Sequence, residues 1–201
     1  FSLQRSLNLT ENQEEDFRVV AEEMRRLDNI VRNFLEFSRP PKLDKQRVNI
    51  SSVIDMTMEL LEYRLRRHDA AVTRRRGEDL PPVEADPELI KEVLVNLIVN
   101  ACEAMGEGGQ IFITESQSVT DQGEHTVRVE IRDTGPGIPE EIQQQILEPF
   151  HTTKAQGTGL GLFIAARIVR EHGGELDLYS AEGRGASFII VLPAVKAGED
   201  G

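Results

Sequence analysis

Two asparagines one helical turn apart are the first candidates for chemistry. They are Asn96 and Asn100, in the segment LIKEVLVNLIVNACEAM, whose apolar residues recur at helical spacing. Asparagine is a poor residue for a helix interior, because its side chain competes with the backbone for hydrogen bonds. The spacing therefore indicates two carboxamide oxygens presented to a ligand, such as the hard cation Mg²⁺. Two side chains that face solvent or cap a neighbouring loop would give the same pattern.

The stretch VEIRDTGPGIP reads as a strand that ends in Asp133 and continues into a Gly-x-Gly turn. At Gly135 and Gly137 the backbone can approach a flat or anionic group without an obstructing Cβ. An ionised aspartate beside this turn can accept a hydrogen bond from an exocyclic amine, such as that of adenine. Alone, the motif is a weak signal, because an ordinary strand that ends in a polar turn looks similar.

The stretch GTGLGL at 157–162 leads directly into the periodic segment FIAARIVREHGG. A glycine loop before a helix points free N–H groups and the positive end of the helix dipole at one place, which suits a phosphate. The stretch lacks the Gly-Lys-[Ser/Thr] of a Walker A loop and the G-x-G-x-x-G spacing of a dinucleotide fingerprint. A plain glycine-rich turn is the alternative for this loop alone.

The elements that must position these residues alternate after Pro40 and Pro41. Strands are expected at 47–50, 71–75, 82–85, 111–116, 126–132, 175–179 and 186–192. Helices are expected from a Ser51 or Ser52 cap to 65, from an Asp86 cap to 105, and at 139–147 and 159–172. This order predicts an α/β sandwich in which one sheet is covered by helices on one face.

A separate long helix is expected at about 14–38, before the two prolines. Its apolar residues alternate in spacings of three and four: Phe17, Val20, Met24, Leu27, Val31 and Phe34. The narrow seam favours part of a helical-hairpin dimerisation element. An amphipathic helix packed on its own domain is the alternative.

Composition sets outer limits. Hydrophobic residues make up 39% of the 201-residue chain and charged residues 29%, a globular balance. A net charge of −12 disfavours a nucleic-acid surface, so an anionic ligand would need local backbone donors or a metal. Cys102 is the only cysteine, which excludes an internal disulfide. No apolar run could span a membrane, and a start at Phe1 without methionine leads us to expect a piece of a longer protein.

Five stretches in order, NLIVNA, DTGPGI, EPFHTTK, GTGLGL and GRGASF, resemble the nucleotide-binding boxes of sensor histidine kinases of two-component systems, in a short-lid, nitrogen-sensor-like subgroup. The resemblance implies a catalytic ATP-binding domain over 43–195, with a mixed sheet backed by helices as in gyrase-type ATPases. Residues 1–42 would be the C-terminal part of the dimerisation and phosphotransfer hairpin, and 196–201 a flexible tail.

The resemblance also implies a binding site for Mg²⁺ and ATP or ADP. Asn100 would be the metal ligand, Asn96 would support the phosphate or metal shell, and Asp133 would bind the adenine amine. The base site would be completed by Gly135, Gly137, Ile138 and Ser187, the last where many relatives have threonine. A short lid would comprise Phe150, Thr152, Thr153 and Lys154. The phosphates would be wrapped by Gly157, Thr158, Gly159, Leu160 and Gly161. Asn96 and Lys154, the latter on a phosphate, would be the catalytic residues.

Two positions depart from the family pattern. Glu103 stands where many members have a phosphate-holding lysine, a role that Lys154 would take over. The four histidines are His68, His125, His151 and His172, so none lies before Pro40. The acceptor histidine is expected upstream of Phe1, and this chain alone should not autophosphorylate.

Three further side-chain groups are interpreted without a functional role. His151 is expected to be an exposed loop histidine in preference to a phosphate contact. His172 is expected to be structural, as a cation at a helix end. The basic run from Arg74 to Arg76 is expected to be a solvated strand end.

The expected function is transfer of the γ-phosphoryl group of ATP to a histidine on the hairpin, for relay to an aspartate of a response regulator. The rival is a stand-alone ATP hydrolase or chaperone-type ATPase of the same fold. In those relatives a glutamate four residues before the metal asparagine activates water, whereas here that position is Asn96, which cannot act as a base. The resemblance further implies a homodimer through the hairpin and a cytoplasmic location, with inner-membrane anchoring of the full-length protein left open.

Overall fold

The computed structural model describes residues 13–21, 23–24, 43–120, 123–152 and 158–195. In it, five strands form a sheet in the order β2-β4-β5-β7-β6. The strand bounds are β2 Ala71–Arg75, β4 Gln110–Val119, β5 His125–Asp133, β6 Glu175–Ser180 and β7 Ala186–Pro193. Strand β2 runs parallel to β4, and the other neighbours are antiparallel. The sheet is therefore mixed, as predicted.

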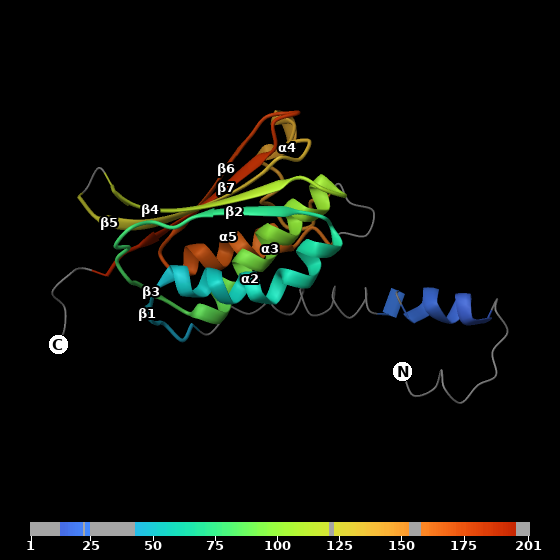
Figure 1. Cartoon of the computed structure of the whole chain (residues 1–201), viewed down its shortest axis with the longest axis horizontal. Coiled ribbons are helices and arrows are strands. Elements are labelled where there is room, and N and C mark those ends of the chain that lie inside the picture. The colour runs from blue at the N-terminus through green and yellow to red at the C-terminus, as the bar shows by residue number, and fades with distance from the viewer. Residues whose placement is uncertain (1–12, 22, 25–42, 121–122, 153–157, 196–201) are drawn as a thin grey trace.

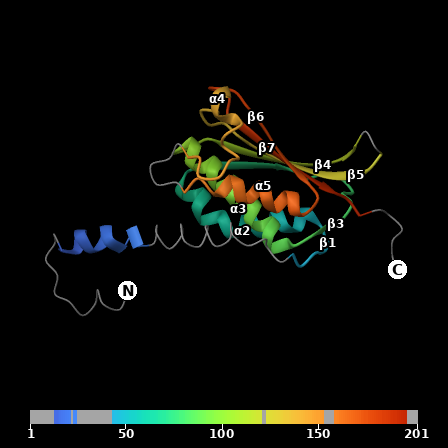
Figure 2. The ribbon, with the colours of Figure 1, turned by 180° about the vertical axis from the view of Figure 1, so that it is seen from behind.

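Three helices cover one face of this sheet (Figures 1 and 2). They are α2 Ile50–Arg67, α3 Pro87–Met105 and α5 Gly161–Glu171, and α3 packs against both of the others. A short α4, Glu140–Gln143, contacts β6. The predicted two-layer arrangement is confirmed. The prediction of a long helix over 139–147 is wrong, because 144–147 form turns.

The prediction of a single sheet is also wrong. Strands β1 Gln46–Val48 and β3 Val83–Ala85 pair antiparallel as a separate two-stranded sheet. Each of these strands leads directly into a helix, β1 into α2 and β3 into α3, so the pair ties the two helix starts together.

The helix starts follow capping chemistry. Asp86 caps α3 as predicted, its Oδ1 accepting from the N–H groups of Glu88 at 3.1 Å and Leu89 at 3.3 Å. Helix α2 is capped by Asn49, whose Oδ1 accepts from the N–H of Ser51 at 2.9 Å. The predicted serine cap is therefore off by two or three residues, because Asn49 offers its oxygen to the free N–H of the first turn.

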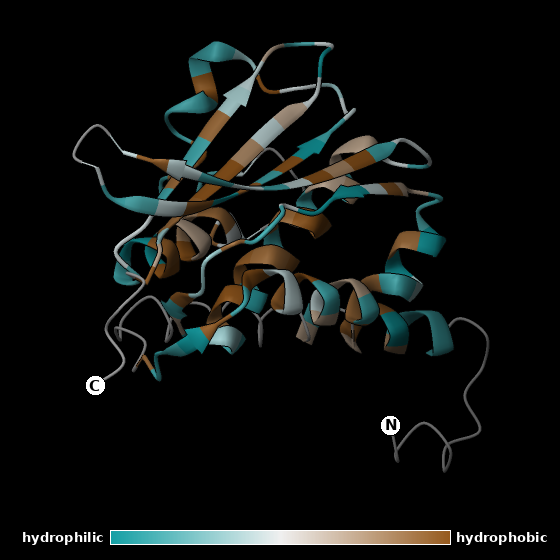
Figure 3. Ribbon diagram, turned by 60° about the vertical axis from the view of Figure 1, so that its left-hand side comes forward, coloured by the Kyte–Doolittle hydropathy of each residue, from teal (hydrophilic) through white to brown (hydrophobic). Residues whose placement is uncertain are grey.

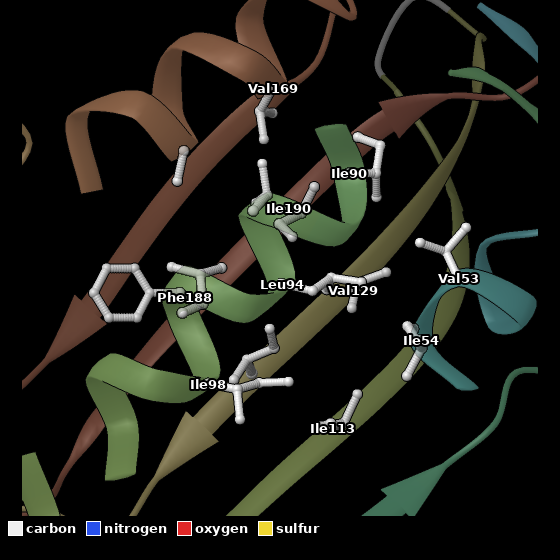
Figure 4. Close-up of a cluster of buried hydrophobic side chains, with 14 of the residues drawn as sticks. Val53, Ile54, Ile90, Leu94, Ile98, Ile113, Val129, Val169, Phe188 and Ile190 are labelled. Carbon is white, nitrogen blue, oxygen red and sulfur yellow. The ribbon is translucent and has the colours of Figure 1, made fainter. Parts of the chain in front are cut away.

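The core lies between the helices and the sheet. Hydrophobic residues gather where the two layers meet, and hydrophilic residues occupy the outer turns (Figure 3). Ile90, Leu94 and Ile98 of α3 point toward Val129 and Ile190 of the sheet (Figure 4), and all five are at most 1% exposed. Burial of this side of α3 leaves the asparagines on its flank.

Residues 13–21 and 23–24 are helical, as predicted for the N-terminal segment. Phe17, Val20 and Met24 of the seam are exposed, while Leu27, Val31 and Phe34 lie outside the described residues. Within the described part of the chain, no helix is both long and apolar enough to cross a bilayer.

Candidate nucleotide-binding site

Asp133 ends β5 as a buried carboxylate with one oxygen held by the backbone. It is 4% exposed, and its Oδ1 accepts from the N–H groups of Gly135 at 2.8 Å and Ala186 at 3.2 Å. Burial raises the pKa of this carboxyl above its usual range, and the two N–H groups oppose that shift. No hydrogen bond to Oδ2 is recorded within the described residues, so this oxygen remains for a ligand donor.

Two backbone contacts fix the turn that follows Asp133. A Cβ on Gly137, whose φ is +76°, would lie 2.1 Å from the carbonyl oxygen of Ala181. The N–H of Ile138 donates to Ser180 Oγ at 2.8 Å. Both predicted residues are therefore anchored through their backbones to the end of β6.

Sequence reasoning missed two residues of this site, Gly185 and Ala186. A Cβ on Gly185 would lie only 2.0 Å from the carbonyl oxygen of Asp133, and Ala186 supplies the second N–H to the carboxylate. Gly185 is the second glycine of GRGASF and directly precedes β7. A glycine directly before a predicted strand is the sequence signal that could have identified Gly185.

The placement predicted for Ser187 is wrong. Ser187 pairs with Arg132 in the β5–β7 register, so its side chain lies on the sheet face opposite to the helices, whereas Asp133 lies on the helix side. Its Oγ donates to Glu130 Oε1 at 2.6 Å, and it lines a hollow of about 510 Å³ on that open face. The residue beside the carboxylate is Ala186, which has no hydroxyl.

Asn96 and Asn100 are both half-buried on α3, one turn apart. A Cβ on Gly161 would lie 3.4 Å from Asn96 Oδ1, so the Asn96 amide lies against the first residue of α5. The structure thus brings the asparagine helix and the glycine loop together, as the sequence motifs predicted.

Leu160 immediately precedes α5 and is fully buried, so only its backbone is available to a ligand. Its side chain cannot accept from the first-turn N–H groups, and its own N–H points to Thr158 Oγ1 at 3.4 Å. The helix N-terminus beside Asn96 therefore keeps backbone donors that suit an anion. Helix α5 starts at Gly161 and not at the predicted 159, because Gly159 adopts a φ of +67°.

The predicted lid segment begins with Phe150, which is 58% exposed and has a φ of +67°. A Cβ on Gly159 would lie 2.5 Å from the carbonyl carbon of Phe150, so the backbones of these two residues lie against each other. Thr152 and Thr158 are described, whereas the predicted contacts Thr153, Lys154 and Gly157 lie outside the described residues.

The predicted Mg²⁺ site depends on the side-chain amide oxygen of Asn100. Within the described ranges, no group of three or more His, Cys, Asp or Glu side chains is arranged to hold a metal. Hard cations such as Mg²⁺ also accept carboxamide and phosphate oxygens, which Asn100 and a bound nucleotide would offer. This donor set fits Mg²⁺ held jointly with a nucleotide and does not fit a protein-only cage.

The sequence predicted that Arg74 belongs to a solvated strand end, and this prediction is wrong. Its guanidinium lies 2.5 Å from Glu115 Oε1 and 2.5 Å from Asp55 Oδ1, and the Glu115 side chain is fully buried. Ser51 Oγ also donates to Glu115. This ion-pair network joins α2, β2 and β4 at the sheet edge that lies away from β6 and β7.

His172 has the predicted structural role, but not as a helix-end cation. Its Nδ1 donates to the carbonyl of Ile168 at 2.7 Å, and its Nε2 accepts from the N–H of Asp86 at 2.9 Å. The ring is therefore neutral, because a nitrogen that accepts from an N–H cannot carry a proton.

Residues 85–196 match the family model for the histidine kinase-, DNA gyrase B- and HSP90-like ATPases. This chain belongs to that ATPase family. Among curated relatives of this ATPase domain, sporulation kinase E of Bacillus subtilis (strain 168) is 32% identical over 92% of this chain and 24% of that protein. The sensor histidine kinase ZraS of Escherichia coli (strain K12) is 35% identical over 88% of this chain and 37% of ZraS. This chain spans well under half the length of these relatives.

Solved structures agree with this assignment. The catalytic domain of the histidine kinase ThkA is 38% identical, with a TM-score of 0.66 over 75% of this chain and 96% of that chain. ThkA in complex with the response regulator protein TrrA gives a TM-score of 0.77 at 33% identity, over 96% of this chain and 54% of that chain. Full-length ShkA in complex with AMPPNP gives a TM-score of 0.78 at 26% identity, over 96% of this chain and 41% of that chain. The resemblance to sensor histidine kinase ATPase domains is confirmed.

Proposed function

We propose that this chain is the ATP-binding module of a protein-histidine kinase, which presents Mg-ATP for transfer of the γ-phosphoryl group to a histidine on a helical hairpin. The observation that carries the proposal is Asp133. Its Oδ1 is held by two backbone N–H groups, and its Oδ2 is left for a ligand amine. This arrangement selects an adenine-like donor edge.

The phosphates would lie at the N-terminus of α5, beside Asn96. Backbone donors there would neutralise negative charge in a chain whose net charge is −12. Bound Mg²⁺, held by Asn100 and the nucleotide, would supply charge neutralisation for the polyphosphate. Lys154 would add a cation from the lid. Phosphoryl transfer needs mainly positioning and charge stabilisation from such groups.

Transfer to an imidazole is favoured over transfer to water. A carboxamide at Asn96 cannot take a proton from water, which distinguishes this site from that of the hydrolase alternative. A response regulator is the proposed recipient of the phosphoryl group. The helical hairpin would form the contact of a homodimer. A cytoplasmic location would give the site access to ATP. The full-length protein would be anchored in the membrane only if a segment outside this chain provides an anchor.

The proposal is tested by phosphotransfer in trans. The chain is incubated with Mg²⁺ and labelled ATP, alone and with a histidine-bearing hairpin helix from a longer version of the protein. We expect no label on the chain alone, because residues 1–42 contain no histidine, and acid-labile label on the hairpin. Rapid release of inorganic phosphate with an unlabelled hairpin would favour the hydrolase. If calorimetry with ATP and Mg²⁺ detected no binding, both the kinase and the hydrolase function would be rejected.

A further inference from the structure

The imidazole ring of His151 has a buried nitrogen without a hydrogen-bond partner. Its Nδ1 is buried, and it is the one buried side-chain polar atom without a hydrogen-bond partner among the described residues. The residue as a whole is half-buried, so the predicted exposed loop histidine is wrong. An unpaired buried nitrogen is costly, and such an atom in a native structure requires an explanation.

The position of His151 suggests that explanation. A Cβ on Gly159 would lie 2.7 Å from the N and 2.8 Å from the carbonyl carbon of His151, so the backbones of these two residues lie in contact. Two residues beyond Gly159, Gly161 lies against Asn96 Oδ1 at the start of α5. Helices α3 and α5 lie side by side (Figure 1). His151 is therefore adjacent to the uncapped end of α5, where the proposed function places the phosphates.

We propose that His151 is a positioning residue that contacts the phosphate chain, with Nδ1–H donating a hydrogen bond to a polyphosphate oxygen of the bound nucleotide. The inference rests on the proposed nucleotide site. Phosphate oxygens only accept, and an imidazole can carry its proton on Nδ1. The bond would give the buried nitrogen its partner and fix the His151 ring beside the α5 N-terminus when a phosphate is bound.

The first test is a comparison of imidazole ¹⁵N resonances. Spectra of the chain are recorded without ligand, with adenosine, with ADP and with AMPPNP plus Mg²⁺. We expect the Nδ1 resonance of His151 to move with ADP and AMPPNP but not with adenosine. His172 is an internal reference, because both of its ring nitrogens are bonded inside the core. An Nδ1 resonance that responds equally to adenosine and ADP would overturn the phosphate contact.

The second test uses three substitutions at one position. His151→Asn keeps a donor near the position of Nδ1, His151→Gln moves it to the position of Nε2, and His151→Ala removes it. We expect ADP to bind roughly tenfold more weakly to the Ala and Gln variants, and the Asn variant to recover most of the affinity. Adenosine affinity should be unchanged throughout. His125→Ala, at the exposed start of β5, is the matched control and should bind ADP like the wild type.

Thermal unfolding separates this role from a structural one. Without ligand, His151→Asn and wild type should melt together, while saturating ADP should raise the melting temperature of His151→Ala less than that of wild type. Equal ADP affinity in wild type and His151→Ala would overturn the inference and leave the proposed function intact. Failure of the wild type to bind any nucleotide would instead reject the proposed function.

Discussion

The backbone of Gly185 lies directly against the carbonyl oxygen of Asp133, where a Cβ would be only 2.0 Å away. This approach brings the start of β7 to the end of β5 and lets the N–H of Ala186 reach the buried carboxylate. The position of the acidic group at the centre of the site therefore depends on the absence of a side chain at 185.

Gly185→Ala should disrupt both stability and nucleotide affinity. Gly183 in the same turn is the matched control, since it has a φ of +74° but nothing within 4 Å of its Cβ position. Gly183→Ala should cost only the left-handed strain of about 1–2 kcal/mol. Gly185→Ala has the same strain and also a backbone clash, so it should cost about 1–3 kcal/mol more. Urea unfolding of both variants measures the difference, and equal losses would contradict the close approach.

Asp133→Asn should weaken ATP and ADP binding about tenfold or more, because a charge-assisted hydrogen bond to the base is lost. The Asn side-chain oxygen can still accept from Gly135 and Ala186, so the fold should persist. Calorimetry with ADP provides the affinity, and circular dichroism checks the fold. An unchanged affinity would reject Asp133 as the contact to the base.

The raised pKa of Asp133 predicts a pH dependence of stability. The folded protein holds this proton more tightly than the unfolded chain, so the contribution of Asp133 to stability is fully present below about pH 4 and is lost as pH rises through the raised pKa. Replacing the Asp133 carboxyl with an amide, which does not ionise, removes this loss of stability. In the absence of nucleotide, Asp133→Asn should therefore be at least as stable as wild type at pH 7, with its advantage shrinking toward pH 4. A larger advantage at pH 4 than at pH 7 would contradict the assigned sign.

Asn100→Ala should reduce Mg²⁺-dependent nucleotide affinity far more than affinity for metal-free ADP. The half-buried amide one turn after Asn96 is the proposed metal ligand. Titrations of one variant with and without Mg²⁺ form their own control. If both affinities shift equally, Asn100 contributes to the site in another way.

Arg74→Met should destabilise the fold by about 3–5 kcal/mol, because it leaves the fully buried Glu115 carboxylate uncompensated. Arg75→Met on the same strand is the control, since Arg75 is exposed and should change stability by only about 0.5 kcal/mol. A double variant with Glu115→Gln should recover part of the loss. The ion pair would be unimportant if the two single variants unfolded at the same urea concentration.

The sequence predicted most elements because their signals are local. The alternating strands, the Asp86 cap and the glycine stop after Met105 depend on neighbours a few residues away. The ordered boxes also predicted the ATPase family, which the comparisons confirm, and they single out Asp133 and the asparagine pair as candidate site residues.

Only the tertiary structure decided which face each side chain occupies. Ser187 and Ala186 are adjacent, and the β5–β7 register alone places Ala186 on Asp133 and Ser187 on the opposite face. Likewise, the charge of His172 depends on an N–H from Asp86, and the burial of Arg74 depends on Glu115. These partners are 41 or more residues away in sequence, and no local pattern encodes a contact that forms only when distant strands and helices pack.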